Sequence, residues 1–432
     1  MSYIPCIVEE TLCKMFPPEF LRNLANKTGL IKRERKIDPV VMFWVLTLSF
    51  GVRLQRTLAS LKRQYEQKGK VKMSDSSWYE RFTLELVKFL KSCVIHGMEE
   101  LAKEPRRNLK EKLIKFKDLL IKDNTIIRLH KSLAKKFPAV RARKVAAGVK
   151  VGLLISAVSN GPKSVSLYGE RTNDAKTLKI GPWVKDRILL IDLGFYKHHV
   201  FTRIVEYGGY FVTRLKGTAD PIIVSLNSIC RGKSIDVIGK RVSEVLPKLK
   251  RQILDVEVEV PLKRRSYQGK QKKDIVRFRL VAILNEEERK YHTYITNIDN
   301  DTLKAEDIAS LYGARWDIEL MFKELKSRYA LDVVNTKNVQ IIEAYIWIAI
   351  LTLLVSRRIY CLVRDQNPGK KMVRYTQLRW STIFSEMASD QLTTILQYCG
   401  IQRTFETVIN VYNSQALDPH VNRHRFREEW WA

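Results

Sequence analysis

The chain has 432 residues, of which 77 are Lys or Arg and 46 are Asp or Glu, so its formal net charge is +31. Hydrophobic residues make up 45% of the sequence, which is enough for a packed core and excludes an intrinsically disordered protein. The length predicts roughly two to four domains, or one elaborated domain. The positive charge is larger than an ordinary metabolic enzyme carries, and it favours a polyanionic partner: nucleic acid first, an anionic membrane surface second.

A membrane protein is not favoured by the sequence. The most apolar stretch, residues 344–355, is about a dozen residues long, whereas a spanning helix needs about 20, so we expect a buried core helix there. The N-terminus lacks the basic region and apolar run of a signal peptide. The six cysteines include no Cys-x-x-Cys pair, which argues against a zinc or disulfide framework. We therefore expect a soluble cytoplasmic protein with no membrane partner.

Residues 1–108 form the first predicted domain, which is helical. Asp38-Pro39 predicts a helix start before the apolar run 40–50, and a second periodic stretch covers 54–65. The sequence Ser77-Trp-Tyr-Glu80 has the form of a capping box and predicts a third helix. The basic residues of this domain indicate that it binds DNA; they are Arg53, Arg56, Lys62 and Arg63. The alternative is a helical bundle whose basic residues are merely solvated.

From residue 109 the pattern changes to strands, and residues 109–217 form the first part of a predicted mixed α/β core. The run 119–127 is β-rich, and 149–158 and 163–168 flank a hairpin signal at 159–162. The segment 187–192 contains four consecutive apolar residues, as expected of a central strand buried on both faces. A further strand is predicted at 210–215.

Residues 218–285 are predicted to be a β-rich basic insertion, because 253–260 alternates and 275–281 is strand-like. The basic run between these strands predicts a sequence-independent clamp on DNA, with a solvated loop as the alternative; it comprises Lys263, Arg264, Arg265, Lys270, Lys272 and Lys273. Residues 286–360 form the second part of the core, with a helix from Ala305 to about Tyr329. Residues 361–432 form a C-terminal helical region.

That helix carries the residues best suited to chemistry. On one continuous helix, Tyr312, Arg315, Glu319 and Lys326 share a stripe of roughly 60°, with Lys323 beside it. The adjacent face is apolar and consists of Ile318, Met321, Phe322 and Leu325. A solvated face with ordinary ion pairs is the alternative. A phosphodiester enzyme, however, needs this mixture, since a carboxylate holds Mg²⁺ while Arg, Lys and Tyr grip phosphates.

One glutamate cannot hold two divalent cations, so partner carboxylates are expected at strand ends. Asp192 is the strongest candidate because it directly follows four buried apolar residues, and Asp123 within the run 119–127 is the second. Three other acids compete, namely Asp118, Asp174 and Asp186. The histidines at 130, 198 and 199 have no supporting Cys or His spacing, so surface or phosphate contacts are favoured over metal ligation.

The spacing Tyr312-x2-Arg315-x3-Glu319-x6-Lys326 resembles the signature of the insertion-sequence-four family of DDE transposases. Residues 192–195 (Asp-Leu-Gly-Phe) are similar to that family's second-aspartate motif. Residues 122–125 (Lys-Asp-Asn-Thr) are similar to its first, although Asn124 stands where a small residue is usual. The resemblance covers about residues 110–360.

The resemblance implies a ribonuclease-H-like mixed-sheet catalytic core with an inserted β-rich module and an N-terminal helical domain. Asp123, Asp192 and Glu319 would be the catalytic acids and would bind two Mg²⁺ ions, for which Mn²⁺ can substitute. Tyr312, Arg315 and Lys326 would contact DNA near the cleaved end.

It further implies a prokaryotic insertion-sequence transposase that binds the terminal inverted repeats of its element. Such an enzyme cleaves and transfers DNA strands between element ends and target DNA, and it would act as a homodimer on DNA. The alternatives are a ribonuclease-H-like nuclease without strand transfer, and a non-catalytic repressor derived from a transposase.

Overall fold

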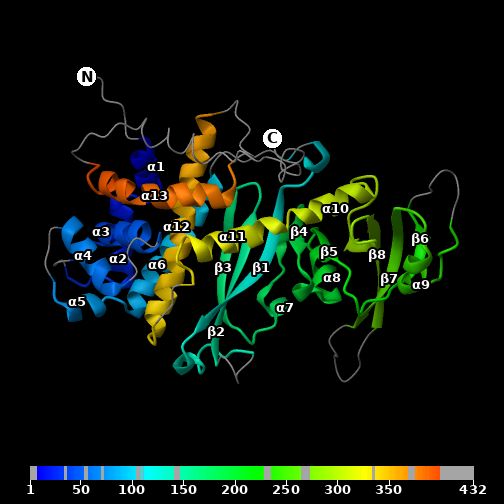
Figure 1. Cartoon of the computed structure of the whole chain (residues 1–432), viewed down its shortest axis with the longest axis horizontal. Helices are drawn as coiled ribbons and strands as arrows, with labels where there is room; N and C mark the ends of the chain where they lie inside the picture. Colours follow the sequence, from blue (N-terminus) through cyan, green and yellow to red (C-terminus); the bar gives the residue numbers. More distant parts are fainter. Residues whose placement is uncertain are drawn as a thin grey trace.

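The computed structural model describes residues 7–33, 37–52, 57–69, 73–103, 109, 111–140, 146–227, 235–263, 273–332, 336–367 and 375–398. The strands in these residues form one mixed sheet with the order β3-β2-β1-β4-β5-β9-β8-β7-β6. Most helices of the N-terminal third gather at one end of the molecule, beside β3, while β6–β8 lie at the other end (Figure 1). The strands are β1 (Asp118–Leu129), β2 (Ala147–Ser156), β3 (Gly161–Gly169), β4 (Arg187–Ile191), β5 (Tyr210–Arg214), β6 (Ile222–Leu226), β7 (Ile253–Lys263), β8 (Lys273–Asn285) and β9 (Lys290–Thr296).

The α-helices lie mainly before and after the sheet in sequence. They are α1 (Ile7–Met15), α2 (Pro18–Thr28), α3 (Pro39–Val45), α4 (Leu58–Gly69), α5 (Asp75–Tyr79), α6 (Leu84–Lys103), α7 (Asp174–Thr177), α8 (His198–Glu206), α9 (Val242–Val245), α10 (Ala305–Gly313), α11 (Trp316–Ser327), α12 (Val339–Asp365) and α13 (Gln377–Leu396).

The central strands run in the directions that the sequence pattern predicts. β1, β2 and β3 are antiparallel, whereas β4 is parallel to both β1 and β5. The strands predicted at 119–127, 149–158, 163–168, 187–192, 210–215, 253–260 and 275–281 are therefore confirmed. β9 pairs with β5 on one side and β8 on the other, so the strands of the basic segment continue the same sheet.

The two faces of the sheet pack into two different cores. Leu119 and Ile121 of β1 belong to the core that contains α11 and α12, whereas Leu120 belongs to the core that contains α8. Neighbouring β4 divides in the same way, with Ile188 facing the first core and Leu189 the second. This period-2 alternation fixes which side chains of β1 and β4 face α11.

The N-terminal helices share the first core with the sheet. Asp38 caps α3 by accepting from the backbone N–H of Val40 at 2.7 Å, which confirms the predicted helix start. Thr352 of α12 donates to the carbonyl of Thr47 at 2.9 Å, and a Cβ on Gly51 would lie 1.8 Å from the Thr352 hydroxyl. Only glycine permits this close approach of the N-terminal segment to α12.

Two predicted helix starts in this region are placed differently. The helix predicted at 54–65 is α4, which begins at Leu58, and Arg53 and Arg56 lie outside the described residues. The prediction that Ser77 opens a helix as part of a capping box at 77–80 is wrong, because Ser77 lies inside α5. Ser74 caps α5 by accepting from the backbone N–H of Ser77 at 3.2 Å. The long helix α6 starts later, at Leu84.

The apolar stretch 344–355 lies within α12, which is 27 residues long rather than about a dozen. Among the described residues, α12 is the one helix long and apolar enough to cross a membrane by length and composition. Its most apolar window is 83% buried inside the molecule, however, between α6 and α11. The predicted buried core helix is therefore confirmed.

Candidate active site

Two aspartates emerge side by side from the centre of the sheet. β1 and β4 are parallel neighbours whose register pairs Lys122 with Ile191, so the next residue on each strand is Asp123 and Asp192. Neighbouring strands lie about 5 Å apart, and alternation directs both side chains to the face that α11 covers. The sequence therefore brings the two predicted aspartates together through register and alternation.

The sequence predicts one helix from Ala305 to about Tyr329, but the structure has two helices there. α10 ends at Gly313 and α11 begins at Trp316. Between them, the N–H of Arg315 donates to Tyr312 and the N–H of Ile318 to Arg315, both three residues back. Such bonds tighten the turn and redirect the chain, so Tyr312 does not share a continuous helical stripe with Glu319.

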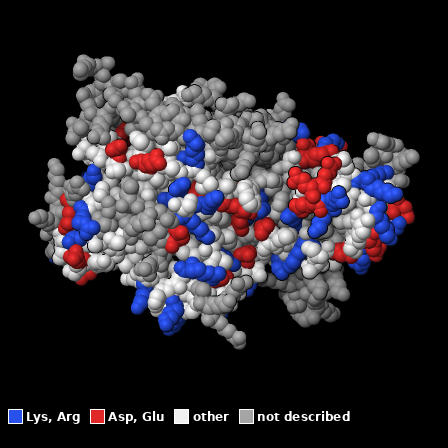
Figure 2. Space-filling model, viewed as in Figure 1, with Lys and Arg blue, Asp and Glu red and all other residues white. Residues whose placement is uncertain are grey.

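Arg315, at this turn, lies among all three predicted acids. Its guanidinium donates to Glu319 at 2.5 Å. The same group lies 3.9 Å from a carboxylate oxygen of Asp123 and 4.0 Å from one of Asp192. Figure 2 shows acidic side chains near the middle of this face, where α11 crosses β1 and β4 in Figure 1, with basic side chains beside them. Three carboxylates from three separate elements therefore converge on one cation.

Burial and like charge act together on Asp123. Burial, followed by the negative charges of Asp192 and Glu319, raises the pKa of Asp123 to about 6. The N–H of Asn124 and the Arg315 guanidinium oppose this rise but do not cancel it. Burial lowers the pKa of Arg315, but Glu319, Tyr312 and Asp192 outweigh it and leave the pKa raised. The cluster is thus a site that needs positive charge to hold its acids ionised.

The aromatic ring of Tyr312 packs against the guanidinium of Arg315. The Arg315 guanidinium carbon lies 5.8 Å from the centre of the Tyr312 ring, a distance at which a cation and an aromatic face attract. Tyr312 also packs 5.4 Å from the ring of Tyr294, and burial raises its pKa to about 12. Its hydroxyl has no hydrogen-bond partner within the described part of the chain.

The two lysines of α11 differ in environment. Lys326 is half-buried, and its ammonium group donates to the carbonyl of Ile126 in β1 at 3.3 Å. Burial lowers the pKa of Lys326. Lys323 is exposed. The predicted apolar face of Ile318, Met321, Phe322 and Leu325 is buried, as expected.

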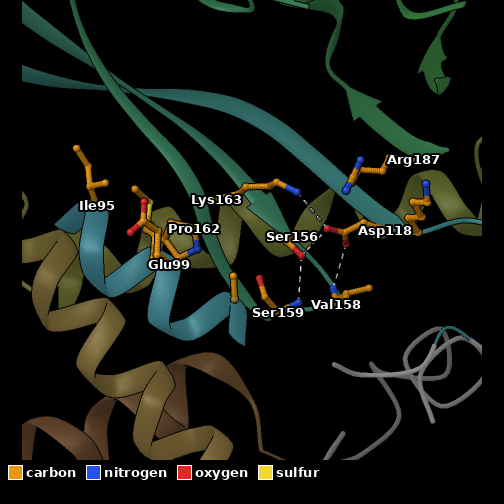
Figure 3. Close-up of a pocket in the computed structure, with 12 residues that line it drawn as sticks. Ile95, Glu99, Asp118, Ser156, Val158, Ser159, Pro162, Lys163 and Arg187 are labelled. Atoms are coloured by element: carbon orange, nitrogen blue, oxygen red, sulfur yellow. Dashed lines mark hydrogen bonds and ion pairs between the residues drawn. The ribbon is translucent and has the colours of Figure 1, made fainter. Parts of the chain in front are cut away.

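The three competing acids lie elsewhere. Asp118 begins β1, about 17 Å from Asp123 at the usual rise per residue, and lines a different pocket of about 260 Å³. There its carboxylate accepts from the hydroxyl of Ser156 at 2.7 Å and lies near Lys163 and Arg187 (Figure 3). Asp186 forms an ion pair with Lys117 at 2.7 Å, which lowers its pKa. Asp174 contacts the opposite face of β1.

The histidines make ordinary contacts. A ring nitrogen of His198 lies 3.0 Å from the carbonyl of Pro261, and His130 accepts from the backbone N–H of Ser132 at 3.2 Å. The tip of the predicted basic clamp, with Arg264, Arg265, Lys270 and Lys272, falls outside the described residues. Lys263 is the last residue of β7 and Lys273 the first of β8, and the two form the terminal pair of that ladder.

One buried ion pair escaped the sequence interpretation. Glu324 lies outside both the predicted functional stripe and the predicted apolar face, yet its side chain is fully buried and pairs with Arg357 of α12. Burial raises the pKa of Glu324, and Arg357 opposes that rise. The sequence holds one clue to this ion pair: Glu324 is next to the apolar face of the helix, where a charged side chain needs a buried partner.

The side chains of the site suit a divalent cation in their chemistry. Carboxylate oxygens are the ligands that Mg²⁺ and Mn²⁺ prefer, and three of them already surround the Arg315 cation. As they stand, no three Asp, Glu, His or Cys side chains in the described ranges form a ready metal-binding group. The donor set and its charge fit, and the guanidinium takes the central position.

Comparison with known proteins adds an independent finding. Residues 114–355, more than half of the chain, match the protein family described as the transposase DDE domain. The chain is 24% identical over 371 residues to the transposase for insertion sequence element IS231B of Bacillus thuringiensis subsp. berliner, covering 75% of this chain and 73% of that one.

Two further relatives cover still more of the chain. It is 22% identical over 451 residues to the transposase for insertion sequence element IS231F of Bacillus thuringiensis subsp. israelensis, covering 92% of this chain and 87% of the relative. It is 21% identical over 387 residues to the transposase for insertion sequence element IS1151 of Clostridium perfringens, covering 82% of this chain and 80% of the relative.

Proposed function

The chain belongs to the family of transposases with a DDE domain, and from this premise we propose that it moves an insertion sequence by cleaving and joining DNA strands. Its substrates are the terminal inverted repeats of that element and a target DNA. The observation that carries the proposal is the convergence of Asp123, Asp192 and Glu319 on Arg315. These are the acids that the sequence motifs single out, and they come from β1, the end of β4 and α11.

We further assign the chain to the insertion-sequence-four family, with Tyr312, Arg315, Glu319 and Lys326 as its signature residues. The core is ribonuclease-H-like in this proposal, and the parallel β1–β4–β5 order with antiparallel β2 and β3 supports it. The proposed division is a helical DNA-binding domain (1–108), two core parts (109–217 and 286–360), a basic insertion (218–285) and a C-terminal helical region (361–432).

The three carboxylates would hold the catalytic metal ions, two Mg²⁺ or Mn²⁺. When bound, such ions activate the attacking hydroxyl and stabilise the leaving oxygen of an in-line displacement. The protein provides oxygen ligands on rigid elements, since Asp123 and Asp192 are fixed by strand register and Glu319 by α11. Asp123 must lose its proton before it can act as a ligand, and its raised pKa opposes this loss. Positive charge nearby lowers the pKa of Asp123 and so favours the ionised, ligating form.

Arg315 has two roles in this scheme. In the DNA-free protein, its guanidinium neutralises the carboxylates. When metal ions supply that charge, the guanidinium is released to donate to a backbone phosphate, for which its planar fork is well suited. Tyr312 keeps Arg315 close to the site, and Lys326, Lys323 and the basic run at 263–273 add contacts to the DNA backbone. Two ends are brought together by a homodimer on DNA.

The test uses the purified full chain, Mg²⁺ or Mn²⁺, and a DNA fragment that carries the native ends of the element. Nicked ends and joined products are expected. Glu319→Gln should reduce cleavage by at least about 10³-fold, because the reaction depends on the whole carboxylate set. Glu306→Gln, an exposed acid in the first turn of α10, is the control and should cleave normally.

Each other outcome has a definite meaning. Cleavage without joined product would indicate a nuclease. Intact DNA binding without cleavage under any of these conditions would indicate a repressor derived from a transposase. Full cleavage by Glu319→Gln would show that the site is assigned wrongly.

A further inference from the structure

A polar cluster lies on the face of β1 opposite the three carboxylates. We call it the rear cluster, and it consists of Lys122, Asn124, Lys150, Asp174 and Thr177. Lys122 and Lys150 are 3% and 6% exposed, although they carry long ammonium side chains. Burial of two cations is costly unless they are paired and hydrogen-bonded, so these contacts need an explanation.

The contacts of the rear cluster centre on Asp174, the first residue of α7. Its carboxylate accepts from the Asn124 amide at 2.7 Å and from the Lys150 ammonium at 2.7 Å. Asn124 is bound further, since its amide also donates to the hydroxyl of Thr177 at 3.1 Å and its oxygen accepts from Lys122 at 3.2 Å. The side chain that departs from the usual first-aspartate motif is therefore held from three directions.

The cluster reaches both aspartates of the candidate active site. The backbone N–H of Asn124 donates to the carboxylate of its neighbour Asp123 at 2.7 Å. On the second motif, Gly194 lies against Asp174, because a Cβ on Gly194 would stand 2.8 Å from a carboxylate oxygen of Asp174. Asp174 thus touches the residue after Asp123 and the residue two positions after Asp192.

The charge of the cluster also suits its place. Two lysines face one aspartate, so the rear cluster carries an excess of positive charge. This charge lies one strand thickness behind a group of three acids. Positive charge at that distance reduces the mutual repulsion of the acids without competing for their oxygens.

We propose that Asp174 is a positioning residue, which fixes the separation of Asp123 and Asp192 from behind the sheet and thereby sets the affinity of the site for a divalent cation. The inference rests on the proposed metal-dependent function of that site. Asp174 itself does not touch the metal or the DNA. It acts through Asn124 on one motif and through Gly194 on the other.

The experiment measures Mn²⁺ binding to the DNA-free full chain by isothermal titration calorimetry, together with thermal unfolding. Asp174→Ala should weaken Mn²⁺ binding by about 10- to 100-fold, the usual effect of losing a residue that orients metal ligands. Asp174→Asn keeps the shape and one acceptor, and should restore most of the affinity. Gly194→Ala should weaken binding as well, since its methyl group displaces the Asp174 carboxylate.

Asp118→Asn is the control, because Asp118 is a hydrogen-bonded acid on β1 that contacts Ser156 and Val158 and takes no part in the rear cluster. It should leave the Mn²⁺ affinity unchanged. If Asp174→Ala and Gly194→Ala both bind Mn²⁺ as tightly as the unmodified chain, the positioning role is refuted. If the unmodified chain binds no Mn²⁺ and cleaves no DNA, the proposed function itself fails.

Discussion

Asp123 is the residue on which the environment of the site acts most strongly. Its side chain is 21% exposed, it stands beside two other acids, and its pKa is raised to about 6. The sequence showed an acid in a β-rich run but not its environment, because the neighbours come from positions 192, 315 and 319. Chemistry at this site is therefore determined by residues distant in sequence.

The raised pKa of Asp123 makes the metal-free protein less stable as pH rises. A group with a raised folded pKa contributes stability that is present below the unfolded value, 3.8, and is lost as pH rises through about 6. The rise of the Asp123 pKa from 3.8 to about 6 corresponds to about 3 kcal/mol in the free energy of unfolding. Asp123→Asn should therefore unfold at higher urea concentration than the unmodified chain at about pH 7.5 in EDTA, and the gain should shrink at about pH 4.5.

Asp186→Asn serves as the control for this measurement. The pKa of Asp186 is lowered by its hydrogen bond from Lys117, so its removal should bring no gain at neutral pH. An equal gain in both variants would indicate a general effect of net charge and contradict the assignment to Asp123.

Arg315 occupies the position that a metal ion would take among the acids. Because its guanidinium takes the central position among the three acids, Arg315→Ala should bind Mn²⁺ more tightly than the unmodified chain in the absence of DNA. The same variant should cleave DNA more slowly, since a phosphate contact is lost. Calorimetry and a single-turnover cleavage assay measure the two effects. Weaker Mn²⁺ binding by Arg315→Ala would contradict the proposed displacement of the guanidinium.

At the scale of the element, α11 carries function on one side and structure on the other. Glu319 faces the carboxylates of β1 and β4, whereas Glu324 is buried against Arg357 of α12. Nearby, the hydroxyl of Tyr329 donates to Ser356 at 2.8 Å, and the indole of Trp380 donates to the same oxygen at 2.9 Å. These contacts fix α11 against α12 and α13, and so hold Glu319 in place.

Removal of one partner of the buried pair should destabilise the protein strongly. Glu324→Gln leaves the Arg357 charge buried without a counter-charge, which costs about 3–5 kcal/mol, whereas Glu324→Met with Arg357→Leu should cost much less. Glu343→Gln is the control on α12, because it breaks a more exposed pair with Lys136 and should cost about 1 kcal/mol or less. Urea unfolding measures the free energy of unfolding of the unmodified chain and of these three variants. Equal losses of stability for Glu324→Gln and Glu343→Gln would refute the structural role of the Glu324–Arg357 pair.

The elements that the sequence predicts well are those specified locally. The strand at 187–191 and the hairpin at 147–169 follow from apolar runs and a turn signal within each segment. The turn between α10 and α11 was not predictable in this way, because Arg315 has helical backbone angles and only its three-residue hydrogen bonds reveal the bend. The pairing of Glu324 with Arg357 likewise depends on a partner 33 residues away.

At the scale of the whole molecule, the +31 charge does not form one uniform surface. Acidic and basic side chains are interspersed on the face shown in Figure 2. The carboxylates at the centre carry the proposed reaction, and the densest basic run, 263–273, lies between β7 and β8 in the sequence. Charge composition indicated a polyanionic partner but could not indicate the chemistry.

DNA binding should therefore depend strongly on salt. Replacement of Arg264, Arg265, Lys270 and Lys272 by Gln should reduce the slope of log K against log salt concentration by about 3 to 4, if each contacts one phosphate. The control replaces four exposed lysines elsewhere, namely Lys131, Lys135, Lys240 and Lys290. Fluorescence anisotropy at several salt concentrations measures both slopes. An equal reduction in the two variants would show that the basic run is no dedicated clamp.

In the proposed mechanism, Asp123, Asp192 and Glu319 form one metal-binding site. Iron-directed backbone cleavage tests it most directly: Fe²⁺ is bound in place of Mg²⁺, and ascorbate with peroxide then cuts the chain next to the bound ion. We expect cuts near residues 123, 192 and 319, with suppression by excess Mg²⁺ and loss in Glu319→Gln. Cuts confined to other segments, or cuts that persist in Glu319→Gln, would contradict the account.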